Sequence, residues 1–197
     1  MAGESRTARI AYQGMEGSFS ETAAKLWAEL ERLDSFELLP GRNARGVAKA
    51  VQSGEADYGV VGVVNSTSGT IGETADTMEA VRHTVVGSLV LHVAIGLFAL
   101  PDMKLEDVRT VVSHPASLYQ CERTLKRVLP NVDLIAAPTS AIAAMRLASN
   151  ELPAGSAVLC SPRAGLLRKL VPLLMPANDN GQNETAFMVF RRPPGRR

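Results

Sequence analysis

The sequence is poor in cysteine and has no long uninterrupted apolar run. It contains two cysteines, Cys121 and Cys160, which lie far apart and form no CxxC pattern. That spacing argues against a zinc site and against a disulfide framework. Both lie in apolar or helical surroundings, so we expect two buried free thiols. The longest apolar stretch, residues 85–100, is too short and too interrupted by glycine, serine and histidine to span a membrane.

Charge of one sign is also scarce. Lys and Arg total 21 against 20 Asp and Glu, and the formal net charge is +1. This balance gives no electrostatic reason to expect nucleic-acid or membrane binding. The basic residues of segment 191–197 either bind an anionic partner or form a solvated chain end without a role, and the second interpretation is favoured. Residues 1–9 carry no apolar signal core, so we expect a cytoplasmic protein.

What the sequence does contain is an alternation of strand-like and helix-like segments, which favours an α/β fold with mostly parallel sheets. A near-continuous β-branched run at 58–64 predicts a central strand buried on both faces. A break near 78–86 divides the pattern in two. The other strands are expected at 9–12, 36–39, 88–100 (one strand or two), 108–112, 134–136, 157–160 and 187–190, and the helices from Ser18 onward and at 45–53, 118–128, 140–147 and 162–169.

A glycine-rich turn follows the first predicted strand. Gly14 and Gly17 permit a tight turn, and Ser18 with Glu21 fits a capping box at the start of the next helix. Free backbone N–H groups at such a turn suit a carboxylate or phosphate. The turn lacks the Gly-Lys-Ser/Thr ending of a P-loop and is not a GxGxxG motif. A capped turn without a ligand explains it equally well.

Two further polar segments follow predicted strands. Residues 65–70 are dense in hydroxyls and include Asn65, which suits a polar small molecule or simply a hydrophilic loop. Ser113-His114-Pro115 precedes a predicted helix, and His114 is either an acid–base group or a structural cap. His83 and His92 have no visible partner. Neither a Ser-His-Asp order nor metal-ligand spacing is present, so the residues themselves give no reason to expect a catalytic triad or a metal site.

Taken together, five segments in this order resemble the prephenate dehydratase family over about residues 9 to 190. Asn183-Glu184-Thr185-Ala186-Phe187 resembles the family's Asn-x-Thr-Arg-Phe. The others are 11–20, similar to a strand ending in Gly-Pro-Glu-Gly-Thr-Phe; 59–66, similar to Gly-Val-Val-Pro-Ile-Glu-Asn-Ser; 74–76; and 113–121, similar to Ser-His-Pro-Gln-Ala-Leu with its downstream Gln-Cys.

The resemblance implies two Rossmann-like lobes of the periplasmic-binding-protein type II kind, with an active-site cleft between them. Lobe 1 would comprise 1–78 and 177–197, and lobe 2 residues 79–176. It also implies decarboxylative dehydration of prephenate, a small dicarboxylate, to phenylpyruvate, without metal or cofactor, by a homodimer. The site residues so implied are Thr185, Asn65 and Ser66 as catalytic groups, and Ser18, Phe19, Ser113, His114, Phe187 and Arg45 as substrate-binding groups.

The chain departs from the family at several motif positions. Ala186 stands where the family has Arg, and Val64 where it has Glu. Loss of a charge-assisted Arg contact typically costs ~1.5–3 kcal/mol. Arg42 or Arg45 either replaces that cation or is ordinary surface charge. The remaining departures are Gly62 for Pro, Met15 for Pro and Ala116 for Gln.

Three functions stay open on the sequence alone. The first is a prephenate dehydratase that tolerates an altered carboxylate pocket. The second is a diverged enzyme of specialised metabolism that decarboxylates prephenate without aromatising it. The third is a non-catalytic binder of a small carboxylate. No phenylalanine-binding regulatory domain and no chorismate mutase helix bundle is recognised, so we expect no feedback by phenylalanine.

Overall fold

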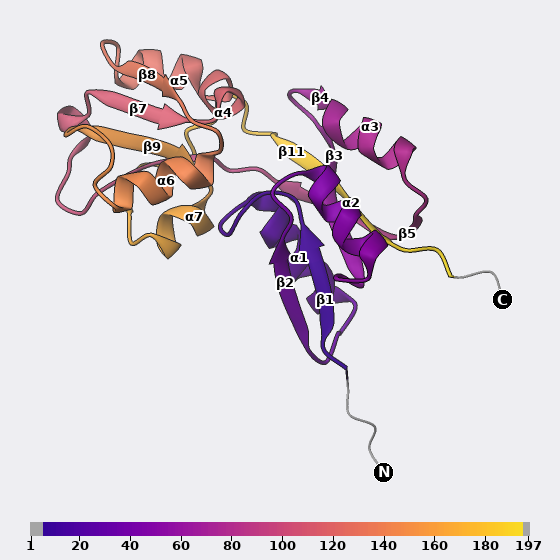
Figure 1. Cartoon of the computed structure of the whole chain (residues 1–197). Helices are drawn as coiled ribbons and strands as arrows, with labels where there is room; N and C mark the ends of the chain where they lie inside the picture. Colours follow the sequence, from indigo (N-terminus) through magenta and orange to yellow (C-terminus); the bar gives the residue numbers. More distant parts are fainter. Residues whose placement is uncertain (1–5, 195–197) are drawn as a thin grey trace. The chain divides into compact units, whose positions relative to one another are not determined.

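A computed structural model describes residues 6–194 (Figure 1). The chain forms two compact units. Unit 1 contains the chain up to Leu91 and again from Glu184, and unit 2 runs from His92 to Asn183. These boundaries lie later than the 78/79 and 176/177 boundaries of the predicted lobes, because the strand at 84–92 joins the sheet of unit 1. The segment after residue 176 bonds to unit 2, since the Ala177 amide donates to the Ile95 carbonyl. The extent of each lobe as a separate domain stays a prediction.

Unit 1 is built on a mixed sheet in the order β2-β1-β3-β11-β5, with β4 paired to β3. β2 and β3 pair parallel to β1, whereas β11 returns antiparallel to β3. Its elements are β1 (Ala8–Tyr12), α1 (Phe19–Leu30), β2 (Phe36–Pro40), α2 (Ala44–Ser53), β3 (Tyr58–Asn65), β4 (Gly69–Thr70), α3 (Gly72–Ala80), β5 (Thr84–His92) and β11 (Glu184–Arg191).

Both faces of this sheet are covered, as the β-branched run predicted for the central strand. Val60 of β3 packs in a cluster with Trp27 of α1, whereas its neighbour Val61 packs in a second cluster with Val47 of α2. Successive side chains of a strand point to opposite faces, so α1 and α2 lie on opposite sides of β3. The strand order also puts the carboxyl ends of β1 and β3 at a switch point, where open α/β sheets bind ligands.

Unit 2 repeats this plan with the sheet order β10-β6-β9-β7-β8. β8 and β9 are parallel to β7, and β6 is antiparallel to both β9 and β10. Its elements are β6 (Gly96–Ala99), η1 (Leu105–Asp107), β7 (Thr110–Ser113), α4 (Pro115–Gln120), α5 (Glu122–Val128), β8 (Asp133–Ala136), α6 (Ser140–Ala148), β9 (Ser156–Cys160), α7 (Pro162–Leu167) and β10 (Val171–Leu174).

The α/β class is confirmed, but the expectation of mostly parallel sheets is wrong. Each sheet has a parallel part and an antiparallel part, because β11 runs against β3, and β6 runs against β9 and β10. The apolar stretch 88–100 is divided between two sheets as β5 and β6. The single helix expected at 118–128 is two helices that meet at Cys121. Helix α3 was not expected from the sequence, because its polar residues show little helical periodicity.

Among residues 6–194, no helix combines the length and apolar character needed to cross a bilayer. Within the same residues, no group of three or more His, Cys, Asp or Glu side chains is arranged to hold a metal ion. Both cysteines are buried and unpaired by any disulfide, as expected. Of the basic chain end, Arg191 and Arg192 lie within the described residues, whereas residues 196 and 197 lie outside them.

Candidate active site

The centre of the candidate site in unit 1 is a hydrogen-bonded pair, Asn65 and Thr185. Asn65 is the last residue of β3, and Thr185 lies directly opposite it on β11. The Asn65 Nδ2 group donates to Thr185 Oγ1 at 2.9 Å and to the Glu184 carbonyl at 3.0 Å. The two side chains are only 7% and 8% exposed. Two residues that are 120 positions apart in the sequence are therefore direct neighbours in the sheet.

The other end of the Asn65 amide is fixed just as firmly. Its Oδ1 accepts from the Thr67 and Ser68 amides, each at 3.0 Å, and from Ser68 Oγ at 3.1 Å. Both N–H donors and the carbonyl oxygen thus have partners, and the amide cannot flip without breaking these bonds. A fixed amide orientation means that Thr185 Oγ1 is an acceptor in this pair.

This geometry determines where the Thr185 hydroxyl proton can go. A hydroxyl has one O–H donor and two acceptor lone pairs, and one lone pair already receives the Asn65 N–H. Within residues 6–194, no acceptor for the Thr185 O–H is recorded. The hydroxyl is therefore held in place while its proton is available to a bound molecule.

Ser66 continues the junction of β3 and β11. The Ser66 amide donates to the Glu184 carbonyl at 2.8 Å, and Ser66 Oγ accepts from the Glu184 amide at 2.9 Å. These two bonds extend the ladder by one residue beyond Asn65. Ser66 therefore holds β3 and β11 together next to the Asn65–Thr185 pair. Its catalytic role stays a prediction.

A register shift lies immediately beyond Thr185. Ala186 pairs with Val64, but Phe187 pairs with Gly62, so the ladder is irregular between Ala186 and Phe187, and Val63 of β3 is the extra residue. Such bulges redirect side chains and are frequent beside functional sites. Phe187 is 2% exposed and packs in the core with α1. Its side chain is a packing group here, and substrate contact by Phe187 stays a prediction.

Two positions at which the family has charged residues and this chain has apolar ones lie directly opposite each other. Ala186 and Val64 are Cα partners across the β3–β11 ladder. Directly opposed side chains on an antiparallel pair lie about 4.5–5.5 Å apart and interact. An Arg–Glu pair in the family motif is therefore replaced here by an Ala–Val pair at one place in the sheet.

The glycine turn lies at the same switch point. The Gln13 amide donates to the Val60 carbonyl, and Gln13 Oε1 accepts from the Gly62 amide at 3.2 Å. Ser18 caps α1 by accepting from the Glu21 amide, as predicted, whereas the Glu21 carboxylate reaches the Gly17 amide at 2.6 Å. Phe19 begins α1 and packs against its core cluster.

Arg42 lies beside this turn and Arg45 does not. The Gly14 and Arg42 backbones exchange two hydrogen bonds, of 3.0 and 3.1 Å, and Arg42 adopts a φ of 62°. Arg45, one residue inside α2, instead lines a pocket of about 240 Å³ between α2 and α3 with Lys49 and Asp76. No contact links Arg45 to the Asn65–Thr185 pair among the described residues, so its substrate-binding role stays a prediction.

In unit 2, the predicted residues Ser113 and His114 end β7 and begin α4. Ser113 is fully buried and donates to the Leu159 carbonyl at 2.6 Å. Ser140 lies 3.0 Å from both Ser113 and Ser117. Each hydroxyl has one proton, so the donors run from Ser117 to Ser140 to Ser113. In this series of hydrogen bonds each hydroxyl proton has an acceptor within the protein. A substrate contact by Ser113 stays a prediction.

His114 is exposed and acts as the N-cap of α4. Its Nδ1 accepts from the Ala116 amide at 3.2 Å, so a proton on the neutral ring resides on Nε2. Of the two interpretations in the sequence analysis, this is the structural cap, although Nε2 is left to face solvent or a ligand. A substrate-binding role for His114 stays a prediction.

The surroundings of three ionisable groups in unit 2 shift their pKa values. Burial raises the pKa of both thiols to about 12: for Cys121 the charge of Asp179 adds to the effect, and for Cys160 the Gly165 amide opposes it. Partial burial would raise the pKa of Asp179, but it is outweighed by the amides of Arg123 and Thr124 and by the Arg123 charge, so that pKa is lowered. The thiols are thus unreactive, and Asp179 stays ionised at the start of α5.

Sequence reasoning gave no role to Gln13 and ranked Arg42 no higher than Arg45. Contacts between segments fix the places of both residues. Gln13 accepts a hydrogen bond from the Gly62 amide of β3, and Arg42, in a left-handed conformation, exchanges backbone hydrogen bonds with Gly14. The available signal was their position at or shortly after the ends of two predicted strands. Parallel neighbours bring their carboxyl ends together, which places such residues at one edge.

Comparison with known proteins identifies what the chain is similar to. A family model described as prephenate dehydratase matches residues 10–195. Arogenate dehydratase 1 of Petunia hybrida is 36% identical over 191 residues, and prephenate dehydratase of Amycolatopsis methanolica is 32% identical over 187. These alignments cover 95% and 94% of this chain but only 43% and 59% of those proteins. The chain thus spans well under two thirds of the relatives' length.

The fold has a solved counterpart of the same description. The structure of prephenate dehydratase from Arthrobacter aurescens in complex with L-Phe superposes with a TM-score of 0.86 at 24% identity. The match covers 95% of this chain and 61% of that one. At this identity it shows the fold alone, and that fold is the one the sequence resemblance implied.

Proposed function

The chain belongs to the prephenate dehydratase family, and we propose that it is a lyase that removes water and carbon dioxide from prephenate to give phenylpyruvate. The observation that carries the proposal is the Thr185 hydroxyl, oriented by Asn65 with its own proton available. The pathway role implied is the formation of the phenylalanine carbon skeleton.

The reaction needs little more than binding, orientation and one proton donor. The ring carboxylate leaves as carbon dioxide, and its bonding electrons enter the ring as the C–O bond to the ring hydroxyl breaks. The departing oxygen takes a proton and leaves as water, so the overall reaction consumes one proton. Aromatisation supplies much of the driving force. In this proposal Thr185 donates a hydrogen bond to that oxygen and relays the proton from solvent, and the orientation of its hydroxyl by Asn65 supports the role.

The departures from the family motif are compatible with this activity because they are coupled. Removing Arg alone would leave a Glu facing an apolar neighbour, whereas this chain replaces both members of the opposed pair, Ala186 and Val64. The net charge of the pair is zero in either case. The Asn65–Thr185 pair, one residue away, keeps its hydrogen bond. We therefore infer that the altered motif retunes the carboxylate pocket and leaves the proton donor intact.

We propose Arg42 as the cation that compensates for the missing motif Arg. A Cβ built on Gly62 would lie 3.6 Å from Thr185 Cγ2, the Gly62 amide bonds to Gln13, and the next residue, Gly14, exchanges backbone bonds with Arg42. This continuous set of contacts puts the Arg42 backbone at the edge where Thr185 lies. No ion pair of Arg42 is recorded in the described part of the chain, so its guanidinium is available to a substrate carboxylate.

The identity of the substrate is the least constrained part of the proposal. The plant relatives carry the name arogenate dehydratase, and arogenate has an amino group where prephenate has a keto group. We propose prephenate, with arogenate as its competitor. The homodimer implied by the resemblance also stays a prediction, which light scattering during gel filtration would check.

The first experiment is incubation of the purified protein with prephenate and, separately, with arogenate, with products identified by mass and ultraviolet spectrum. Phenylpyruvate above the spontaneous rate, lost in Thr185→Val, supports the proposal. A higher kcat/KM for arogenate would change the substrate and keep the reaction. Loss of carbon dioxide with the hydroxyl retained would identify a non-aromatising decarboxylase. Binding without turnover would identify a carboxylate-binding protein.

The cation is tested by Arg42→Ala with Arg45→Ala as its matched control. Loss of one charge-assisted carboxylate contact should raise KM by about 10- to 100-fold in Arg42→Ala and leave Arg45→Ala unchanged. Equal kinetics for the two variants would contradict the role of Arg42. A larger effect of Arg45→Ala would return the role to the residue that the sequence analysis named.

A further inference from the structure

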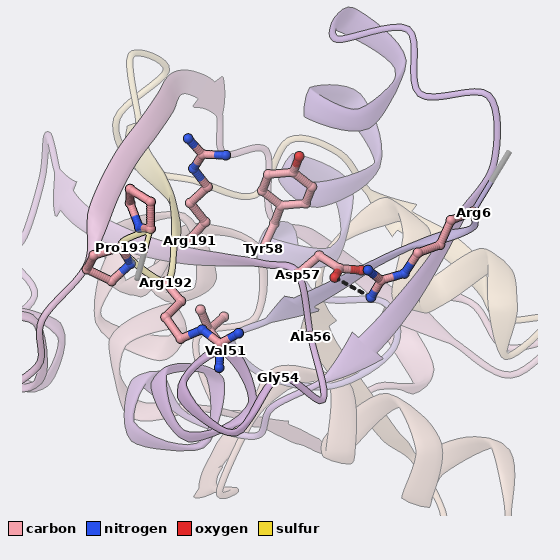
Figure 2. Close-up of a pocket in the computed structure, with 10 residues that line it drawn as sticks. Arg6, Val51, Gly54, Ala56, Asp57, Tyr58, Arg191, Arg192 and Pro193 are labelled. Atoms are coloured by element: carbon pink, nitrogen blue, oxygen red, sulfur yellow. Dashed lines mark hydrogen bonds and ion pairs between the residues drawn. The ribbon is translucent and has the colours of Figure 1, made fainter. Parts of the chain in front are cut away.

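Unit 1 contains a second cavity, at the end of β3 and β11 remote from the candidate active site (Figure 2). It has a volume of about 390 Å³, and its wall comes from the chain before β1, the end of α2, the start of β3 and the end of β11. Tyr58 begins β3 and Arg191 ends β11, whereas Asn65 and Thr185 lie at the other ends of the same strands. Seven residues of extended strand separate the two places by about 23 Å.

The charge around this cavity is unbalanced. Three arginines line it, Arg6, Arg191 and Arg192, with Asp57 as the single acidic residue. Arg6 pairs with Asp57 at 2.8 Å. The second Asp57 oxygen accepts from the Arg9 amide at 2.9 Å, so both carboxylate oxygens are already engaged. For a chain with a formal net charge of only +1, this is a marked local excess of positive charge.

Arg191 and Arg192 have no carboxylate partner among residues 6–194. Arg192 makes one long contact, from Nη1 to the Gln52 carbonyl at 3.5 Å. Figure 2 shows Arg6 turned onto Asp57, while the side chains of Arg191 and Arg192 extend in different directions from the end of β11. Two guanidinium groups therefore flank the cavity without neutralisation.

The rest of the wall is apolar or aromatic. Val51, Ala56, Pro193 and Pro194 supply apolar surface. Tyr58 packs edge-on against Trp27 with their ring centroids 4.8 Å apart, which fixes the tyrosine ring. A cavity of this volume falls within the range that holds small molecules, and unpaired guanidinium groups favour phosphate or carboxylate oxygens.

We propose that this arginine cavity binds a small phosphoryl-bearing anion with at least two negative charges, at a site separate from the proposed catalytic one. The two unneutralised guanidinium groups in the wall match a dianion in charge, and a planar guanidinium fork is suited to phosphoryl oxygens. The site does not depend on the dehydratase proposal, because it uses none of the residues assigned to that reaction.

The test exploits Trp27, the single tryptophan of the chain, as a reporter of the Tyr58 wall. Inorganic phosphate and pyrophosphate are titrated separately at constant ionic strength, with sodium chloride as the blank, while tryptophan fluorescence and the thermal unfolding midpoint are followed. We expect a saturable fluorescence change and a rise in the midpoint. Saturation by phosphate would show that the free ion suffices, and saturation by pyrophosphate alone would indicate a larger phosphorylated molecule.

The matched variants are the double change Arg191→Gln/Arg192→Gln and the control Arg127→Gln, an exposed arginine on α5. The double variant should bind at least about tenfold more weakly, and the control should bind like the parent. Without ligand, the double variant should unfold at the same temperature or higher, because like charges have been removed. Absence of saturation by either anion, or equal binding by the double variant, would overturn the proposal.

Discussion

Replacing Thr185 by valine separates the chemical role of its hydroxyl from its structural role. Valine keeps the β-branched shape that suits a strand, and it removes only the hydroxyl. One Asn65 N–H then loses its acceptor, while the bond to Glu184 and the three bonds to Asn65 Oδ1 remain. Losing one neutral hydrogen bond at a buried site should lower the free energy of unfolding by about 1–2 kcal/mol.

The expected loss of activity is far larger than this loss of stability. Proton transfer by a positioned side chain typically contributes about 10²- to 10⁴-fold to a rate. A domain with an unfolding free energy of roughly 5–15 kcal/mol stays folded after a loss of 1–2 kcal/mol. Thr185→Val should therefore lower kcat by about 10²-fold or more, while the folded fraction stays near unity.

Two further variants make the assay decisive. Thr185→Ser keeps a hydroxyl at the same position and should recover most of kcat. Ser68→Ala removes one bond to Asn65 Oδ1, at 3.1 Å, and should lower stability by a similar amount with little change in kcat. The measurements are initial rates on prephenate and urea unfolding curves for all four proteins. A Thr185→Val enzyme within about threefold of the parent kcat, or an equally inactive Thr185→Ser enzyme, would refute the assigned role.

Three other predictions follow from the same structure. Ala186→Arg and Val64→Glu, made singly and together, should show a favourable coupling of about 0.2–1 kcal/mol in urea unfolding, because the two positions are directly opposed; additive effects would contradict the pairing. Asp179→Ala should lower the free energy of unfolding by about 1–2 kcal/mol near neutral pH, since its carboxylate accepts two amides at the start of α5. The pKa of Asp179 is lowered in the folded protein, so the extra stability of the parent over Asp179→Ala is complete above the pKa that Asp179 has in the unfolded chain. That extra stability is lost as the pH falls through the pKa of Asp179 in the folded protein, and a difference that persists in acid would contradict this. Cys121 and Cys160, both buried with pKa values raised to about 12, should react with a thiol reagent only after denaturation, and fast labelling of the native protein would disprove their burial.

The features that the sequence predicted well are those that local chemistry determines. Ser18 caps α1 because its hydroxyl lies three residues before the amide it accepts from. The run from Tyr58 to Asn65 forms a strand covered on both faces because β-branched residues suit that position. The polar α3 was missed because its residues show little apolar periodicity, and its helix is stabilised by packing on α2 and β3.

The sequence by itself determined that this is an α/β chain with the ordered motifs of one enzyme family, because strand periodicity and motif spacing are written along the chain. The tertiary structure alone decided that β11 returns antiparallel to β3, which makes Asn65 the partner of Thr185 and Val64 the partner of Ala186. It also put the Arg42 backbone against the glycine turn, put Arg45 in a pocket between α2 and α3, and brought Arg6, Arg191 and Arg192 around one cavity. Cross-strand register and long-range hydrogen bonds depend on residues more than a hundred positions apart, and no local pattern specifies them.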